Sequence, residues 1–550
     1  MSSKNKNYAI VQRFLKLLEP HHQEIRYIYV YAIFSGLVSL SLPIGVQSIV
    51  NFIQSGQVTT SWVVLVAFVI FGIAAIGILQ IYQLRLTERI SQKIFVRSSF
   101  DFAFRLPKIK QKLADSNYLP ELANRFFDTM TLQKGLSKIL IDFSSALLQV
   151  LFGLILLAFY HPFFLVFSLL LFAFAVVVYK FTAKRGFEFS KKASKHKYQM
   201  AHWLQEVARS SETFKNSTDS EYVIHRADEY ASKYVKARES HFDILVKQFG
   251  MMVVFKIIIT SLLLIIGGYM VINQMMNIGQ FIASEIVIVM MMGSVEKLIM
   301  SLETLYDMMT GLAKISHVTD MDLDDDDSLA AGIDEGVDFK LELNNATIMD
   351  SRKGEILFKD LNLIVGNKER LFLEKYNATE KNVLGKVFMG YEELVRGFML
   401  VKGRPVVSED FRLRIKSFSE EDKLFEGSFV DNISMGAEDV DLRRLGEILE
   451  LVALESFVKT LDKGLDTIIC CGGCRLHSVT KEKILLARLI YAQPELIVVN
   501  RSMRSFKQEE RESIMDYFVS SERPWSLVLL RDCKMWRNSL EGKNKETLTT

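Results

Sequence analysis

The sequence predicts a multi-domain protein, in which an all-α transmembrane domain of six helices precedes an α/β domain. Hydrophobic residues make up 49% of the 550 residues, a share that favours a membrane protein. Long runs without charged residues occupy the first half of the chain, and a helix needs about 20 apolar residues to cross a bilayer. After Val337, short β-rich runs alternate with helical segments, as they do in an α/β sheet.

Charge, cysteines and the start of the chain exclude three other classes. Lys and Arg number 67 against 64 Asp and Glu, so the basic excess of a nucleic-acid-binding protein is absent. Three of the four cysteines crowd together at Cys470, Cys471 and Cys474, unlike the dispersed framework of a secreted disulfide protein. Residues 1–26 are polar and charged, without the apolar core of a signal peptide. We therefore expect a cytoplasmic N-terminal segment and a reducing environment for the soluble part.

Three predominantly apolar hairpins, of which the first two contain no charged residue, predict six membrane spans within a transmembrane domain of residues 27–315. Each hairpin is long enough for two helices of about 20 residues, and a polar segment divides each one near its middle. The hairpins are residues 27–84 with the turn Gln54–Ser61, residues 143–179 with His161-Pro162, and about 249–300 with the turn Asn273–Gln280.

The basic residues predict the orientation of these spans. Residues 85–138 hold eleven Lys and Arg against five acidic residues, whereas the three turns hold no Lys or Arg. Because basic residues are retained on the cytoplasmic side, both termini should lie inside. The inner connections, about 85–137 and 181–248, are longer than loops require, and their charge spacing suggests helices that continue into the cytoplasm.

An acidic cluster marks the boundary to the second domain. Asp320, Asp322 and Asp324 to Asp327 open a linker predicted at residues 316–337, and residues 338–550 form the α/β domain. The cluster lacks the spaced ligands and turn glycine of an EF-hand calcium site. The expected strands are Leu341–Met349, Arg370–Leu373, Leu496–Val499 and Ser526–Leu530.

Several segments, in this order and spacing, carry a resemblance that runs along almost the whole chain. They are Asn277–Ile299, Leu357–Leu363, Leu424–Met435, Ile484–Arg488 and Pro494–Val499. Together they resemble a half-transporter of the ATP-binding cassette (ABC) exporter family, of the bacterial type I secretion and haemolysin-exporter group. The resemblance implies a P-loop-type nucleotide-binding fold for residues 338–550. It also implies that two chains form one pore and that the inner connections, around Lys110–Leu119 and Glu212–Tyr222, rest on soluble domains, crossing to the partner chain.

The segment that matches the family's phosphate loop has lost its glycines. Such a loop uses glycines so that backbone N–H groups converge on phosphate oxygens, a Lys for charge, and a hydroxyl near Mg²⁺. In Lys375–Val383 the glycine positions hold Lys375, Ala378 and Glu380, and Asn382 replaces the hydroxyl. Only Lys381 matches, and it is the one candidate cofactor-binding residue. A carboxylate at ~4 Å from a phosphate charge repels it by roughly 4 kcal/mol at an effective dielectric near 20.

The other conserved motifs of the family's ATPase site are also altered in this sequence. Where the family has an Asp near Mg²⁺ and a catalytic Glu, this chain has Asn500 and Arg501, and a guanidinium cannot act as a base near pH 7. The signature glycines are replaced in Leu476–Thr480. Asp532 stands at the switch histidine and Glu420 at the loop glutamine. No catalytic residue is therefore predicted, and no cofactor, although the family would bind ATP and Mg²⁺.

Two further residue sets suggest alternatives. Four potential zinc ligands occur at a non-standard spacing: Cys471, Cys474, His477 and Cys533. The alternative is a cysteine-rich loop that binds no metal. In the last hairpin, Lys256, Glu285, Glu296 and Lys297 are ionisable. Glu285 and Glu296 return to nearly one helix face and could line a cavity, or Glu296 and Lys297 could lie at the inner headgroup level, with Glu285 near the outer end.

The sequence thus predicts an exporter-like subunit of the inner membrane with a degenerate ATPase domain. We expect the non-catalytic half or an accessory subunit of an envelope export system. Its partners would be the bilayer, a second ABC half-transporter chain and a periplasmic adaptor, without nucleic acid. Two alternatives remain: an ATP-independent homodimeric scaffold, receptor or channel, and a working exporter that uses unrecognised residues.

Overall fold

Two compact units make up the chain. In the computed structural model, one unit comprises Met1–Pro107 and Asn117–Met321, and the other comprises Lys108–Ser116 and Asp322–Thr550. The structure describes residues 12–15, 18–54, 56, 60–161, 164–216, 221–324, 338–350, 354–405 and 414–541.

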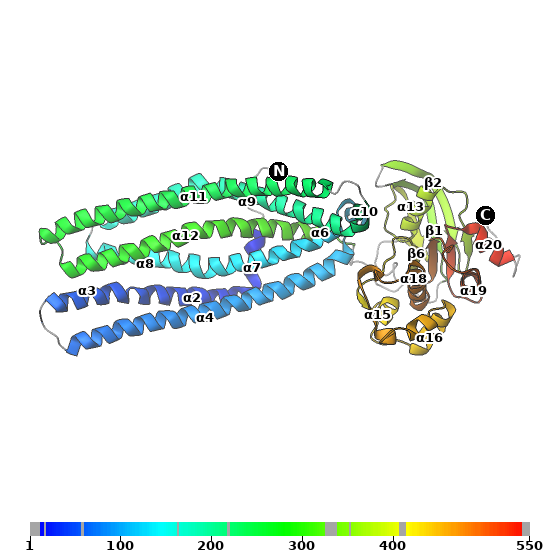
Figure 1. Cartoon of the computed structure of the whole chain (residues 1–550), viewed down its shortest axis with the longest axis horizontal. Helices are drawn as coiled ribbons and strands as arrows, with labels where there is room; N and C mark the ends of the chain where they lie inside the picture. Colours follow the sequence, from blue (N-terminus) through cyan, green and yellow to red (C-terminus); the bar gives the residue numbers. More distant parts are fainter. Residues whose placement is uncertain are drawn as a thin grey trace. The chain divides into compact units, whose positions relative to one another are not determined.

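The first unit consists of helices, as expected for the transmembrane domain (Figure 1). Its long helices are α2 (His22–Ser39), α3 (Ser41–Gln54), α4 (Thr60–Arg105), α8 (Ser144–Tyr160), α9 (Phe164–Arg209), α11 (Glu221–Ile272) and α12 (Ile278–Thr319). Shorter pieces connect them: η1 (Glu19–His21), η2 (Leu106–Lys108), α6 (Leu119–Asn124), η3 (Arg125–Phe127), α7 (Asp128–Lys138), the π-helical turn η4 (Ile139–Phe143) and α10 (Ser211–Lys215).

Five helical segments of the described chain are long and apolar enough to cross a membrane. They are Gln12–Gln54, Thr60–Lys108, Leu119–Tyr160, Glu221–Ile272 and Ile278–Thr319. The sixth expected span falls on α9, several of whose side chains lie outside the described residues, so its crossing stays a prediction. α4 and α9 each run for 46 residues, or about 70 Å, which is more than twice the ~30 Å hydrocarbon layer. The inner connections therefore begin as continuations of these helices, as the charge spacing suggested.

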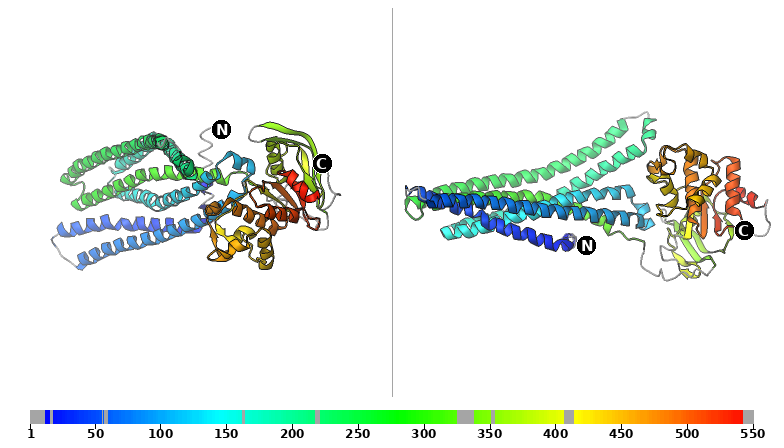
Figure 2. Two further views of the ribbon diagram at one scale, coloured as in Figure 1. Left: turned by 45° about the vertical axis from the view of Figure 1, so that its right-hand side comes forward. Right: turned by 90° about the horizontal axis from the view of Figure 1, so that it is seen from below.

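Pairs of neighbouring helices pack closely along the first unit. α2 lies beside α4, and α9 lies beside α11, in the views of Figures 1 and 2. The rings of Phe174 and Phe255 stack at 4.0 Å between α9 and α11. A Cβ atom on Gly153 of α8 would come within 2.7 Å of Met291 on α12, so the missing side chain permits this close approach.

The helix α12 extends further than the sequence predicted. It begins at a capping box, in which Asn277 accepts from the backbone N–H of Gln280 and Gln280 accepts from that of Asn277. It ends at Thr319, four residues into the expected linker, because the helix-compatible apolar spacing continues to Val318, which is fully buried. The remainder of the expected linker, residues 325–337, lies outside the described part of the chain.

The second unit contains two four-stranded sheets. The antiparallel sheet has the order β2-β1-β4-β5, and the parallel sheet has the order β3-β10-β9-β6. The strands are β1 (Leu341–Asp350), β2 (Glu355–Val365), β3 (Arg370–Phe372), β4 (Arg396–Val401), β5 (Arg404–Pro405), β6 (Ile415–Ser419), β9 (Leu496–Asn500) and β10 (Ser526–Leu529), with a small pair of β7 (Gly427–Ser428) and β8 (Ile468–Ile469).

Continuous apolar runs place the parallel strands in the core. All four residues of β10 and the first four of β9 are buried, which is typical of strands covered on both faces. Figure 1 shows α15 and α16 together, beside the end of α18. The helices are α5 (Gln111–Ser116), α13 (Ala378–Phe388), α15 (Phe429–Ser434), α16 (Leu442–Leu451), α17 (Glu455–Lys459), α18 (Ser478–Ala492), α19 (Gln508–Val519) and α20 (Cys533–Glu541), with η5 (Gly464–Asp466) and η6 (Cys471–Gly473).

Candidate functional site

The carboxyl ends of three parallel strands bring the expected nucleotide-handling segments together. β3 leads into Lys375–Val383, β9 ends in Asn500, and β10 leads into Arg531 and Asp532. β3, β10 and β9 are adjacent and parallel, so these ends lie at one edge of the sheet, where α/β folds bind ligands. The segment with Lys381, the pair Asn500-Arg501 and Asp532 therefore share one edge.

The first turn of α13 is capped by side chains of its own segment. Asn377 Oδ1 accepts the backbone N–H of Glu380 at 2.9 Å, and Glu380 Oε2 accepts the backbone N–H of Asn377 at 2.8 Å. This reciprocal pair is a capping box. In a phosphate loop, such N–H groups would point at a phosphate. Here two of them are already hydrogen-bonded within the segment, and Glu380 adds a negative charge.

Lys381, the retained residue, is half-buried at the start of α13. Its backbone N–H donates to the carbonyl of Asn377 at 2.9 Å, as a helix requires. Its ammonium group acts on the neighbouring thiol of Cys533. Burial raises the pKa of Cys533, and the positive charge of Lys381 partly opposes that shift.

Two amides and a guanidinium occupy the position where the family holds a metal. Asn500 Nδ2 donates to Asn382 Oδ1 at 3.0 Å, and Arg531 lies 3.4 Å from Asn500 Oδ1 and 3.5 Å from Asn382 Oδ1. Mg²⁺ prefers anionic oxygens and water. These amide oxygens are neutral, they already accept hydrogen bonds, and Arg531 brings a positive charge. The three side chains do not fit a magnesium site.

Arg501 forms an internal ion pair in place of a catalytic carboxylate. Its guanidinium lies 3.3 Å from Glu482 Oε1 and donates to the carbonyl of Ser419 at 3.0 Å. Ser505 Oγ donates to the other oxygen of Glu482 at 2.5 Å. The side chains of Arg501 and Glu482 are only 19% and 11% exposed. Glu482, the partner of Arg501 in this ion pair, was not identified from the sequence.

The position of the switch histidine has structural contacts, whereas the position of the loop glutamine is exposed. Asp532 accepts from Ser502 Oγ at 2.5 Å and pairs with Arg504 at 3.2 Å. Glu420 is exposed directly after β6. Two residues later, Asp422 accepts the backbone N–H of Ser419 at 2.6 Å, and burial raises the pKa of this carboxyl group.

A disulfide, which the sequence analysis did not expect, precedes the signature segment. Cys470 and Cys474 are bonded to each other, and the loop between them turns at Gly472 and Gly473, each with φ of 64°, a conformation that favours glycine. Cys474 is therefore not available as a zinc ligand alongside His477. In the described residues, no group of three or more His, Cys, Asp or Glu side chains is arranged to hold a metal ion.

The residues of the signature segment open the helix α18 without a side-chain cap. His477 is the N-cap residue, makes no capping bond and is exposed, as is Ser478. The segment Leu476–Thr480 thus lies at a helix N-terminus, where the family also places it. Ser478 and the β-branched Val479 stand where the family has the two glycines that allow close approach of a second surface.

Part of the first inner connection belongs to the soluble unit of its own chain. Lys108–Ser116 clusters with Asp322–Thr550. Ile109 forms a β-bridge with Leu323, and Asp115 pairs with Lys386 of α13 at 2.8 Å. This segment is thus part of the second unit of its own chain, and the crossing to a partner chain stays a prediction. Residues 217–220 of the second connection lie outside the described residues.

Three residues that the sequence analysis passed over now join the site. Asn377 had a visible signal, since the pattern Asn377-x-x-Glu380 before a helix is a capping-box signature. Arg531 lies two residues after the end of β10, next to Asp532, and this position could have been examined in the sequence. Glu482 had no local signal, because it lies nineteen residues from its partner and on another element.

Comparisons with known proteins agree with this architecture. Residues 25–295 match the family described as the ABC transporter transmembrane region. The solved structure of a bacterial Atm1-family ABC exporter with ATP bound is similar over 92% of this chain and 90% of its own, with a TM-score of 0.73 and 15% identity. At that identity the likeness shows the fold, and this fold is the expected one: a helical exporter domain followed by an α/β region.

Curated relatives are similar over a part of their length. An ATP-dependent lipid A-core flippase of Legionella pneumophila is 23% identical over 32% of this chain and 33% of its own. The ATP-dependent permease MDL1 of Candida albicans is 23% identical over 33% of this chain and 27% of its own. The alpha-hemolysin translocation ATP-binding protein HlyB of Escherichia coli is 21% identical over 32% and 25%. The matched segments span about a third of these relatives or less.

Proposed function

We propose, from the premise that this multi-pass membrane protein has the membrane region of the ABC transporters and the fold of an ABC exporter, that it is a transporter subunit whose soluble domain does not hydrolyse ATP. It would be the non-catalytic half or an accessory subunit of an envelope export system. We place it in the inner membrane, with the soluble domain and both termini in the cytoplasm, because the basic residues gather in the inner connections.

One observation carries the proposal: the capping box at the start of α13. The N–H groups of Asn377 and Glu380 are hydrogen-bonded to side chains of their own segment. A phosphate that replaced these contacts would have to displace a carboxylate and tolerate its charge nearby. A repulsion of roughly 4 kcal/mol at ~4 Å corresponds to about a thousandfold weaker binding.

The side chains that ATP hydrolysis requires are also missing from the matching positions. Hydrolysis of ATP needs a metal ion on the phosphates and a residue that orients water. Asn500 carries no charge, and Arg501 is engaged with Glu482 and Ser419. We therefore expect no base for water at the end of β9.

A second chain would complete the assembly. Two half-transporters form one pore in the family that the sequence resembles, so we propose a dimer in the bilayer. A partner with an intact ATPase domain would supply the energy in a heteromeric assembly. The likeness to the alpha-hemolysin translocation ATP-binding protein HlyB supports a role in export, and we propose a periplasmic adaptor as a further partner.

The test is nucleotide binding and turnover by the purified protein in lipid nanodiscs, with and without Mg²⁺. We expect no release of phosphate and no rise in the melting temperature with ATP, whereas a ligand at 100 times its Kd would stabilise the protein by about 2.7 kcal/mol. An intact ABC chain should co-purify from the native membrane.

Two results would contradict the proposal in different ways. Steady phosphate release that disappears in Lys381→Ala would mean that the domain is a working ATPase. Recovery of this chain alone as a homodimer, without turnover, would instead favour the ATP-independent scaffold, receptor or channel.

A further inference from the structure

A cavity in the helical unit is lined by four charged side chains. It lies between α12 and the junction of α7 with the π-helical turn η4, and its volume is about 360 Å³. The charged lining residues are Lys138, Asp142, Glu296 and Lys297, and Gly293, Met300 and Ser301 complete the wall.

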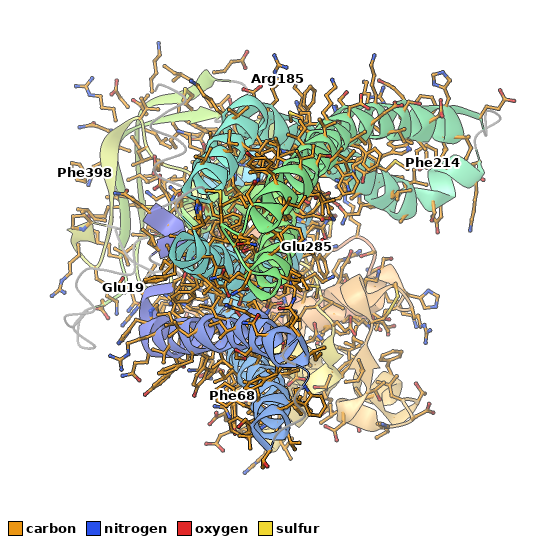
Figure 3. All side chains as sticks on the ribbon, turned by 90° about the vertical axis from the view of Figure 1, so that its left-hand side faces the viewer. Glu19, Phe68, Arg185, Phe214, Glu285 and Phe398 are labelled. Carbon is orange, nitrogen blue, oxygen red and sulfur yellow. A yellow bond between two sulfur atoms is a disulfide. The ribbon has the colours of Figure 1, made fainter. Side chains whose placement is uncertain are left out.

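The residues of α12 form one continuous stripe along this cavity. Gly293, Glu296, Lys297, Met300 and Ser301 follow the spacing i, i+3, i+4, i+7, i+8, which places them on one helix face. Gly293 leaves open space, because a Cβ atom built on it would meet no atom within 4 Å. At the other end, Ser301 donates to the carbonyl of Lys297 at 2.7 Å. Glu285, labelled in Figure 3, lies eleven residues before Glu296 on α12 and does not line this cavity.

The opposite wall of the cavity carries Lys138 and Asp142, directly before and within the π-helical turn η4. Lys138 and Asp142 are four residues apart, a spacing that brings opposite charges together on an α-helix. η4 spans Ile139–Phe143, and its i to i+5 bonding changes the angle between these two side chains. Such turns occur often at functional sites.

None of the four charged groups has an ion-pair partner within 4 Å among the residues that the structure describes. Lys138, Asp142 and Glu296 are half-buried, and Lys297 is exposed. Ionisable groups in membrane helices are costly and usually mark a ligand or ion pathway. Two ammonium and two carboxylate groups in one cavity fit a ligand that itself carries both charges.

The depth of the cavity in the membrane follows from two helices independently. Glu296 lies eighteen residues beyond Ile278, the first residue of α12, and Asp142 lies eighteen residues before Tyr160, the last residue of α8. Each distance is about 27 Å along a helix, against ~30 Å of hydrocarbon. Both helices therefore place the charged groups near one boundary of the bilayer, where the headgroups of lipids lie.

We propose that this cavity binds a zwitterionic group that joins a phosphate or carboxylate to an ammonium. Lys138 and Lys297 would receive the anionic part, and Asp142 and Glu296 the ammonium. The site would thus select amphiphiles or small molecules by their paired charges. The proposal depends on the membrane placement of the helices and not on the loss of ATP hydrolysis, so its test is independent of nucleotide turnover.

The experiment measures lipid binding to the full-length protein by native mass spectrometry. We expect dioleoyl phosphatidylethanolamine to bind at least about tenfold more tightly than dioleoyl phosphatidylglycerol, since a charge-assisted contact contributes at least about one power of ten. Gly293→Leu fills the open space and should remove this preference. Gly268→Leu on α11 is the matched control, because a Cβ at Gly268 also meets nothing within 4 Å and Gly268 does not line the cavity.

Charge variants make the test independent of the filling variant. Asp142→Asn with Glu296→Gln should shift the preference to the anionic phosphatidylglycerol, and Lys138→Gln with Lys297→Gln should weaken the binding of both lipids. Competition by free glycerophosphoethanolamine would assign the site to a soluble zwitterion, and its failure to compete would assign it to a lipid. Equal binding of the two lipids, or identical behaviour of Gly293→Leu and Gly268→Leu, would overturn the proposal.

Discussion

Arg501 illustrates how one residue can change both the chemistry and the packing of this edge. In the family that the chain resembles, the residue that follows β9 would act on water. Here it is Arg501, which binds Glu482 of α18 and the carbonyl of Ser419 at the end of β6. The ion pair is largely buried, so removing one partner would leave an uncompensated charge. The position is therefore occupied by a structural contact.

The substitution Arg501→Glu should fail to restore ATPase activity. It would place a second carboxylate against Glu482, and breaking a buried pair costs roughly 3 kcal/mol. We expect no phosphate release and a marked loss of hydrogen-exchange protection in α18 and β9. The charge-swapped variant Arg501→Glu with Glu482→Arg should recover a large part of that protection. An active, fully stable Arg501→Glu protein would show that the ion pair does not block the site.

Single residues also show what the sequence could and could not predict. Asn500, Arg501 and Asp532 were found from the resemblance to the exporter family, which places functional residues directly after these predicted strands. Glu482 and Arg531 were not, since their roles depend on side-chain pairings between elements. The disulfide of Cys470 with Cys474 depends likewise on the turn at Gly472 and Gly473, which folds the loop back on itself.

At the scale of elements, local sequence signals account for the location of five of the six predicted spans and for the starts of a few helices. α12 and α13 both begin at capping boxes that are legible as Asn-x-x-Gln and Asn-x-x-Glu. The π-helical turn η4 has no such signal, because its residues would fit a regular α-helix equally well. The sequence analysis raised a cavity lined by Glu285 and Glu296; the cavity beside η4 contains Glu296 without Glu285, and its other wall, with Lys138 and Asp142, was not foreseen.

The cap of α13 gives a prediction at this scale. Asn377→Ala removes the side chain that accepts the N–H of Glu380, and loss of such a cap costs about 1 kcal/mol. Hydrogen exchange of the full-length protein should show faster opening of the first turn of α13. Asn377→Gly is the matched control, since glycine at an N-cap costs only a few tenths of a kcal/mol. If both variants exchange like the wild type, the capping box does not stabilise this helix.

At the scale of the whole molecule, composition separated the two kinds of domain, but it did not reveal their connectivity. The charge-free runs and the later β-rich runs are properties of long segments, so they can be recognised in the sequence without knowledge of any contact. The assignment of Lys108–Ser116 to the soluble unit could not be read in this way. It depends on a β-bridge and an ion pair with residues more than 200 positions away.

The proposed orientation can be tested with single cysteines, because all four native cysteines lie between positions 470 and 533. With Cys470, Cys471 and Cys474 changed to Ser and Cys533 to Ala, the helical unit contains no thiol. Met275 lies exposed in the turn between α11 and α12, and Asn216 lies exposed after α10, in an inner connection.

In this background, Met275→Cys should react with a membrane-impermeant maleimide in cells whose outer membrane has been permeabilised and whose inner membrane is intact. Asn216→Cys should react only after the inner membrane is also permeabilised, because the basic residues of the inner connections keep that side in the cytoplasm. Each variant serves as the control for the other, since both thiols are exposed and differ in the expected side alone. The reverse pattern would place the soluble domain outside, where it could not meet cytoplasmic nucleotide or the ATPase domain of a partner chain.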